Sequence, residues 1–266
     1  MRYYYLLATL PDLQPATLLK ELDIPETIQL IRDNLEPEGL RQVNYLLYRN
    51  DNINFIDLLV KRRKNFNIFS EANPSYFSMT ELEFLLRNKY ALPEYMSDFL
   101  VRFDDQTSSM SVKELEDLLW ENYFTEVANT CEGFVRAYSD FDRELRSLVM
   151  SSNSRNFPGQ DLGSSLATTL KQGKPSEYDV INSHHDELMD ALLIKQPKLI
   201  QVTMDKIRWD FADQYRSTDF FTLDRVCAIF LKLMTLTKWV RSNDLLEVGV
   251  LQMRIDSILA NVESLE

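Results

Sequence analysis

The feature that most constrains the fold is an apolar stripe in the middle of the chain, whose members recur every three or four residues. They are Leu115, Leu119, Tyr123, Val127, Cys131, Phe134, Tyr138, Phe141, Leu145 and Leu148. A capping box, Ser111 with Glu114, precedes the stripe. This spacing is that of one face of an α-helix. We therefore predict one helix over residues 111–150, about 60 Å long at about 1.5 Å per residue, in which Gly133 is a point where a kink is possible.

The N-terminal part predicts several shorter helices. Asp23 and Glu26, with Pro25 between them, are typical of a helix start. The polar pair Asp51-Asn52 is expected to end one helix and to cap another over residues 53–61. The chain has only six glycines, which disfavours β-sandwiches and nucleotide-binding α/β sheets because both depend on tight turns.

The C-terminal part predicts an antiparallel three-helix bundle. Its helices are expected to begin at Pro197, at Thr222 and at Asn243 or Asp244. Residues 151–175 are rich in Ser, Asn, Gly and Gln and predict a loop or hinge. The expected architecture is all-α: a single elongated helical domain over 1–266, with a long central helix and a possible hinge separating 1–150 from 176–266.

Composition excludes several classes of protein. The formal net charge of −12 over 266 residues disfavours nucleic-acid binding, which needs clustered Lys and Arg. Cys131 and Cys227 fall within apolar helical patterns, which favours buried free thiols and a reducing compartment. The N-terminus does not fit a signal peptide, because only Arg2 is basic and Pro11 follows a short apolar run. We expect a cytoplasmic protein with no membrane-spanning segment.

The sequence offers no constellation for catalysis. It has no Gly-rich phosphate loop and no nucleophile elbow. The two histidines, His184 and His185, are adjacent and therefore point about 100° apart on a helix, which is a poor metal face. A solvated helix start explains them better. The carboxylates on 111–150 are expected to form a solvated helix face, so we predict no enzyme activity, no cofactor, no metal and no small-molecule substrate.

The N-terminal sequence YYYLLATLPDL, residues 3–13, resembles the opening of an uncharacterised bacterial family encoded beside subunits of V/A-type ATPases. Three other stretches are similar to the C subunit of those ATPases, called d in the eukaryotic enzyme. They are DNIN at 51–54 ahead of the basic 61–64, ELEDLLWENYF at 114–124, and the weaker VTMDKIRW at 202–209.

This resemblance implies a non-catalytic coupling subunit, peripheral to the cytoplasmic face of the cell membrane. The implied partners are the rotor-shaft subunits and the proteolipid ring, and the implied membrane contact is only through that ring. Tyr3, Tyr4, Tyr5 and Leu6 are the candidate partner-binding residues. Two alternatives stay open: a helical scaffold or regulator unrelated to ATPases, and an enzyme that uses helix carboxylates.

Overall fold

The computed structural model describes residues 3–11, 13, 22–64, 71–88, 92–106, 110–156, 180–215 and 221–242. Within these ranges every regular element is an α-helix, so the predicted all-α class is confirmed. The helices are α1 (Tyr4–Thr9), α2 (Ile24–Asp33), α3 (Pro37–Lys64), α4 (Met79–Asn88), α5 (Glu94–Gln106), α6 (Val112–Thr130), α7 (Gly133–Asn156), α9 (Val180–Ser183), α10 (His185–Ile194), α11 (Pro197–Gln214) and α12 (Leu223–Ser242).

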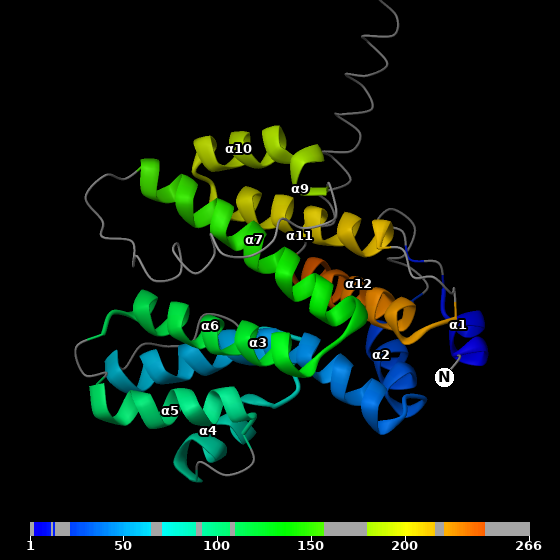
Figure 1. The fold of residues 1–266 in the computed structure, drawn as a ribbon, viewed down its shortest axis with the longest axis horizontal. Coiled ribbons are helices and arrows are strands. Elements are labelled where there is room, and N and C mark those ends of the chain that lie inside the picture. The colour runs from blue at the N-terminus through cyan, green and yellow to red at the C-terminus, as the bar shows by residue number, and fades with distance from the viewer. Residues whose placement is uncertain are drawn as a thin grey trace, which may run out of the picture.

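Helix α12 is the central element. It contacts α2, α3, α7 and α11, and every residue over 226–236 is buried. Because a helix covered on all sides has no face left for water, this run is almost wholly apolar. Its one charge, Lys232, donates to Asp213. Figure 1 shows α3, α4, α5 and α6 on one side of the molecule and α7, α9, α10 and α11 on the other, with α1 and α2 at one end.

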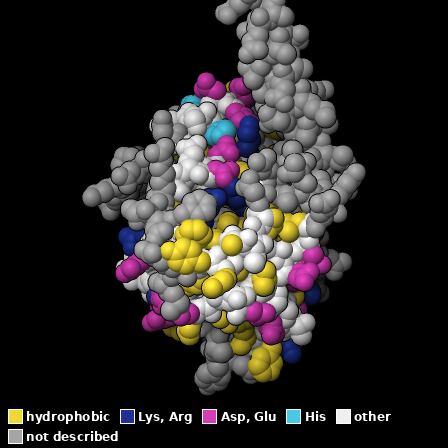
Figure 2. All heavy atoms as spheres, turned by 90° about the vertical axis from the view of Figure 1, so that its right-hand side faces the viewer, with side chains coloured by type: hydrophobic (Ala, Val, Ile, Leu, Met, Phe, Trp, Pro, Cys, Tyr) yellow, Lys and Arg dark blue, Asp and Glu magenta, His cyan; other side chains and the backbone are white. Residues whose placement is uncertain are grey.

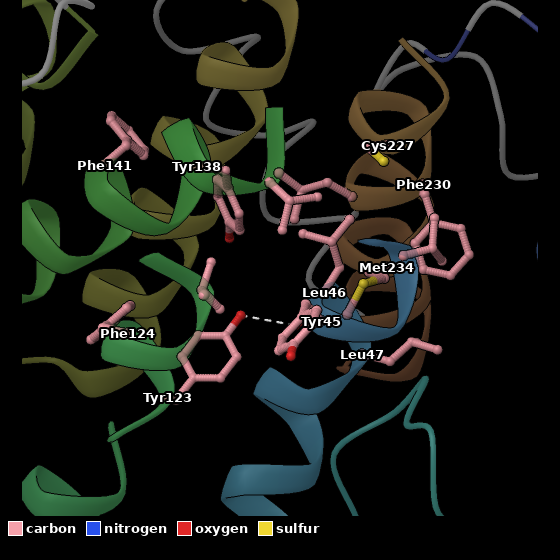
Figure 3. Packing of buried hydrophobic residues seen from close by; sticks show 14 of the residues in the cluster. Tyr45, Leu46, Leu47, Tyr123, Phe124, Tyr138, Phe141, Cys227, Phe230 and Met234 are labelled. Carbon is pink, nitrogen blue, oxygen red and sulfur yellow. Dashed lines mark hydrogen bonds between the residues drawn. The ribbon is translucent and has the colours of Figure 1, made fainter. Parts of the chain in front are cut away.

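One hydrophobic core is shared by helices from both halves of the chain. Figure 3 shows side chains from α3, α6, α7 and α12 meeting in it, among them Leu46, Tyr138 and Phe230. The Tyr123 hydroxyl donates to the backbone oxygen of Tyr45 at 2.8 Å, which joins α6 to α3 inside this core. The helices before and after residues 151–175 therefore pack on the same buried side chains.

The predicted single helix over 111–150 is wrong, although its apolar stripe is assigned correctly. The chain forms two helices, α6 and α7, which pack against each other. All members of the stripe up to Leu145 are buried, and Leu148 packs at the edge of the core. The capping box of Ser111 and Glu114 starts α6 as predicted.

The break between α6 and α7 has a local and a distant cause. Cys131 ends α6 in an extended conformation, with φ −108° and ψ 153°. Gly133 then adopts a φ of 56°, a left-handed conformation that glycine reaches without steric cost. The Asp224 carboxylate, from the first turn of α12, accepts the Phe134 N–H at 2.8 Å. A side chain from another helix thus caps the start of α7.

The predicted helix boundary at Asp51-Asn52 is also wrong, because α3 runs through it as one helix, Pro37–Lys64. Both side chains are fully buried, and so is Asn54. The predicted start of α2 is confirmed, because the Asp23 side chain accepts the Glu26 N–H.

A buried ionic cluster joins three of the helices. The Asp142 carboxylate of α7, which has no exposed side-chain surface, accepts from Arg49 of α3, Arg146 of α7 and Arg208 of α11. Each N–O distance is 2.8 Å. Burial alone would raise the pKa of Asp142, but the three guanidinium groups outweigh it and hold that pKa well below its ordinary value. Arg208 also contacts Asp205 at 3.0 Å.

Two predicted segments fall partly outside the described residues. Residues 151–156 of the predicted loop or hinge continue α7, and the rest of 151–175 lies outside. In the predicted C-terminal bundle, α11 and α12 are present and in contact, whereas the third helix, expected from Asn243 or Asp244, lies outside. Among the described helices, none combines the length and the hydropathy needed to cross a lipid bilayer.

Candidate partner-binding surface

The first internal segment that carries the resemblance, on α3, ties down a neighbouring stretch of backbone. Asp51 accepts the N–H groups of Tyr76 and Phe77, each at 3.0 Å. Asn54 accepts the Ala72 N–H at 2.7 Å and donates to the oxygen of the same residue at 3.0 Å. Because these groups bind one another, Asp51 and Asn54 are internal ties rather than a surface.

The other two internal segments, on α6 and α11, supply side chains to the interior. The buried members on α6 are Leu115, Leu119, Trp120, Tyr123 and Phe124. The buried members on α11 are Val202, Thr203, Asp205, Ile207 and Trp209. Packing accounts for these patterns, as expected for apolar and aromatic residues at helical spacing.

The first turn of α1 is anchored to the body of the protein. The Tyr3 N–H donates to the oxygen of Phe221 at 2.9 Å, and Leu6 is only 6% exposed. Burial and the nearby carboxylate of Glu36 raise the pKa of Tyr3, so its hydroxyl stays neutral. That hydroxyl lies 3.0 Å from where a Cβ at Gly39 would be. The missing side chain of Gly39 makes room for Tyr3.

The opposite side of α1 faces outward. Tyr5 is 91% exposed and Tyr4 is 42% exposed. The Tyr4 ring lies beside that of Phe221, with centroids 4.2 Å apart. The four predicted partner-binding residues therefore separate into two pairs. Tyr3 and Leu6 hold α1 in place, whereas Tyr4 and Tyr5 present aromatic rings at the surface.

The side of the molecule that carries α1 and α2 has a hydrophobic area. Hydrophobic side chains gather in its middle, and acidic side chains lie on both sides, with Lys or Arg side chains next to some of them (Figure 2). On these two helices the large exposed hydrophobic side chains are Tyr4, Tyr5 and Leu30, the last at 41%. We call the surface that these three residues mark the α1–α2 face.

Sequence reasoning missed Leu30, although the signal is present. Thr27 and Ile31 are four residues apart and both are buried, which fixes the inner side of α2. Leu30 is one residue, or about 100°, away from Ile31. It therefore falls toward solvent.

A cavity of about 340 Å³ lies between the chain around α1 and one side of α12. It is lined by Leu7, Leu10, Pro11, Leu13, Arg225, Ile229 and Lys232.

His184, unlike His185, belongs to a polar cluster between α10 and α11. His184 Nε2 lies 2.6 Å from Asp210, and its Nδ1 lies 3.1 Å from Glu187, which also accepts from Lys206. Since both ring nitrogens face carboxylates, neither is available here as a base toward a substrate. The predicted solvated helix start fits His185 but not His184, whose side chain is 16% exposed. Within the described ranges no group of three His, Cys, Asp or Glu side chains is arranged to hold a metal.

Over residues 1–245 the chain matches the family described as a protein of unknown function, DUF2764. The chain belongs to this family. The match to DUF2764 covers every described helix, from α1 to α12, on both sides of 151–175. Comparisons with curated proteins and with solved structures gave no match. Membership of this family does not indicate an activity.

Proposed function

We propose that this DUF2764 protein is a non-catalytic coupling subunit of a V/A-type rotary ATPase. In this role it links the central rotor shaft to the membrane proteolipid ring. It is peripheral to the cytoplasmic face of the cell membrane. Its contact with the membrane is through the ring alone, and it hydrolyses nothing itself.

The observation that carries the proposal is the different orientation of the four segments that resemble the ATPase family and its C subunit. Those on α3, α6 and α11 supply mainly internal ties and core side chains. The N-terminal one presents Tyr5, at 91% exposure, and Tyr4 to the outside. Exposed aromatic side chains that cluster with other apolar groups are typical of protein contacts. The contact with the rotary complex is therefore assigned to α1.

The interior suits a part that transmits torque. The Asp142 cluster joins α3, α7 and α11 through charged groups that are largely buried. Breaking such a cluster leaves charges without partners inside the protein, which is energetically costly. An adaptor with this interior resists shear between its two sides, and load applied at one end reaches the other.

The deciding experiment is affinity purification from native membranes. The full chain carries its tag at the C-terminus, so that no tag is attached next to α1. The membranes are solubilised under conditions that keep the rotary complex intact. We expect rotor-shaft and proteolipid subunits to co-purify. The double variant Tyr4→Ser, Tyr5→Ser should lose most of them, while Leu193→Ser, a change at a 66% exposed position on α10, should not.

Recovery of other partners with no ATPase subunit among them would contradict the proposal and favour the scaffold alternative. Equal recovery of ATPase subunits with the wild type and the double tyrosine variant would support the assignment to the rotary complex. It would contradict the assignment of the contact to α1.

A further inference from the structure

The acidic groups beside the α1–α2 face give its partner a definite chemistry. From the N-cap of α2 to the first turn of α3, five carboxylates are exposed: Asp23, Glu26, Asp33, Glu36 and Glu38. The two cations of this stretch are engaged, since Arg41 pairs with Glu38 at 2.7 Å and Arg32 lies over the Tyr76 ring at 5.9 Å.

Four of these carboxylates keep their charge open to solvent. Within the described residues, Asp23, Glu26, Asp33 and Glu36 form no ion pair. Asp33 accepts only from the Gln29 amide, at 2.7 Å, and Asp23 accepts the N–H that caps α2. Among the described residues, no cation therefore pairs with these four carboxylates beside the α1–α2 face.

We propose that the α1–α2 face binds an amphipathic helix of a partner protein, whose apolar stripe is flanked by lysine or arginine. The stripe covers Tyr4, Tyr5 and Leu30 and removes their apolar surface from water. The flanking cations lie against the carboxylates of α2 and guide the helix into register. The inference deepens the proposed function and rests on it only for the identity of the partner.

The same charges argue against other occupants. An anionic membrane surface or a nucleic acid would bring phosphates against the carboxylates of α2, and like charges repel at this range. A neutral apolar surface would cover the tyrosines but leave these carboxylates unpaired. An amphipathic helix with flanking cations complements both the exposed apolar side chains and the carboxylates beside them.

The test uses two designed peptides of equal length and hydrophobicity. Each is an 18-residue helix, roughly five turns, with a leucine stripe; one carries lysines beside the stripe and its twin carries glutamates. Binding of the labelled peptides to the full-length protein is followed by fluorescence anisotropy. We expect the lysine peptide to bind at least ~10-fold more tightly, and salt to weaken its binding, because exposed charges are screened.

Matched variants show whether the binding is local. Tyr5→Ser should weaken the lysine peptide by ~5- to 30-fold, as removal of a central interface aromatic does, whereas Leu193→Ser on α10 should have no effect. Glu26→Lys should weaken it as well. Glu116→Lys, an exposed position on α6, changes the net charge by the same amount and should leave binding as it is.

Several results would overturn the inference: equal binding of the two peptides, equal effects of the two glutamate variants, or binding to vesicles rich in phosphatidylglycerol but not to the lysine peptide. The assay contains no ATPase subunit. Peptide binding without co-purification of ATPase subunits would therefore refute the proposed function alone. The reverse pattern would refute the cationic-helix inference and leave the proposed function standing.

Discussion

In the middle of α3 and at the junction of α6 with α7, contacts from a distant segment of the chain determine whether the helix continues. The two outcomes are opposite. At Asp51 the helix continues through a polar stretch, and at Gly133 it is interrupted within an apolar one. In both places, contacts with distant residues outweigh the local pattern in the sequence.

In α3 the polar side chains are occupied by another part of the chain. Asp and Asn weaken a helix interior because they can bond the nearby backbone instead. Here Asp51 is engaged by the N–H groups of Tyr76 and Phe77, and Asn54 is engaged by Ala72. Since those partners lie outside the helix, the side chains do not compete for its own hydrogen bonds, and α3 continues.

At the junction a distant group stops the helix instead. The Asp224 carboxylate binds the Phe134 N–H at 2.8 Å and fills the space next to Gly133. A Cβ at residue 133 would lie 2.2 Å from that carboxylate oxygen. If the helix were continuous, the Phe134 N–H would donate to a backbone oxygen within the helix, and Asp224 would lose this hydrogen bond. The apolar pattern on both sides stays inward, and the backbone between them turns.

The largest test removes the group that connects the two regions, because Asp142 of α7 binds Arg49 of α3. Asp142→Ala leaves Arg49 and Arg208, whose side chains are 11% exposed, and the 26% exposed Arg146 without that carboxylate. We expect the free energy of unfolding to fall by about 3–5 kcal/mol, measured by chemical denaturation. Asp140→Ala removes a 43% exposed carboxylate from the same helix and should cost less than about 1 kcal/mol. Similar losses for the two variants would show that the cluster does not hold the helices together.

The next test breaks the junction. Gly133→Ala should lower the free energy of unfolding by about 3 kcal/mol, because alanine is strained at this φ and its Cβ displaces the Asp224 cap. Asp224→Ala removes the cap and the clash together. The two changes combined should therefore cost less than the sum of the single changes. Simple additivity in this double-mutant cycle would contradict the role given to Asp224.

These regions also mark what the sequence could and could not predict. The helix starts at Asp23 and Ser111 could be predicted, because each capping side chain bonds a backbone N–H only three residues further along the chain. The inner face of residues 111–150 could be predicted, because the apolar residues keep their helical spacing on both sides of the junction between α6 and α7. Asp224 lies 90 residues from Phe134 along the chain. No local pattern in the sequence connects them.

The candidate surface was predictable to a similar degree. The N-terminal tyrosines were singled out by their composition and by the resemblance. Which of them faces outward depends on the contact between Tyr3 and Phe221, and on the space at Gly39. Those contacts join separate parts of the chain, so the division between Tyr4 and Tyr5 outside and Tyr3 and Leu6 inside required the structure.

A smaller effect is expected in α3, where the helix itself should survive the change. Asn54→Ala loses both bonds to Ala72 and should cost about 1–3 kcal/mol, while the helical circular dichroism stays unchanged because alanine favours helix. Hydrogen exchange at the Ala72 amide should accelerate. Asn50→Ala, which loses a single bond to Pro74, is the graded control and should cost less. A loss of helicity in Asn54→Ala would mean that the side chain supports α3 rather than the neighbouring backbone.

A pH dependence of stability is expected in the α3 region. Burial raises the pKa of Asp51 to about 7, and its two backbone N–H donors offset only part of that rise. In the unfolded chain an aspartate titrates near its ordinary value of about 3.9. Between these two values the native protein keeps a proton that the unfolded chain releases. The free energy of unfolding should therefore fall as pH rises through this window, by at most about 1.4 kcal/mol per pH unit.

Asp51→Asn isolates this contribution because the amide carries no titratable proton. Urea unfolding of both proteins is measured from about pH 5, just above the isoelectric point of about 4.8, to about pH 8. The stability advantage of the wild type over Asp51→Asn should shrink up to about pH 7 and then level off. Asn54→Ala, which removes no titratable group, should show a constant difference. An advantage that stays constant between about pH 5 and pH 8 would mean that Asp51 is ionised in the native protein, with its charge stabilised by the N–H groups of Tyr76 and Phe77.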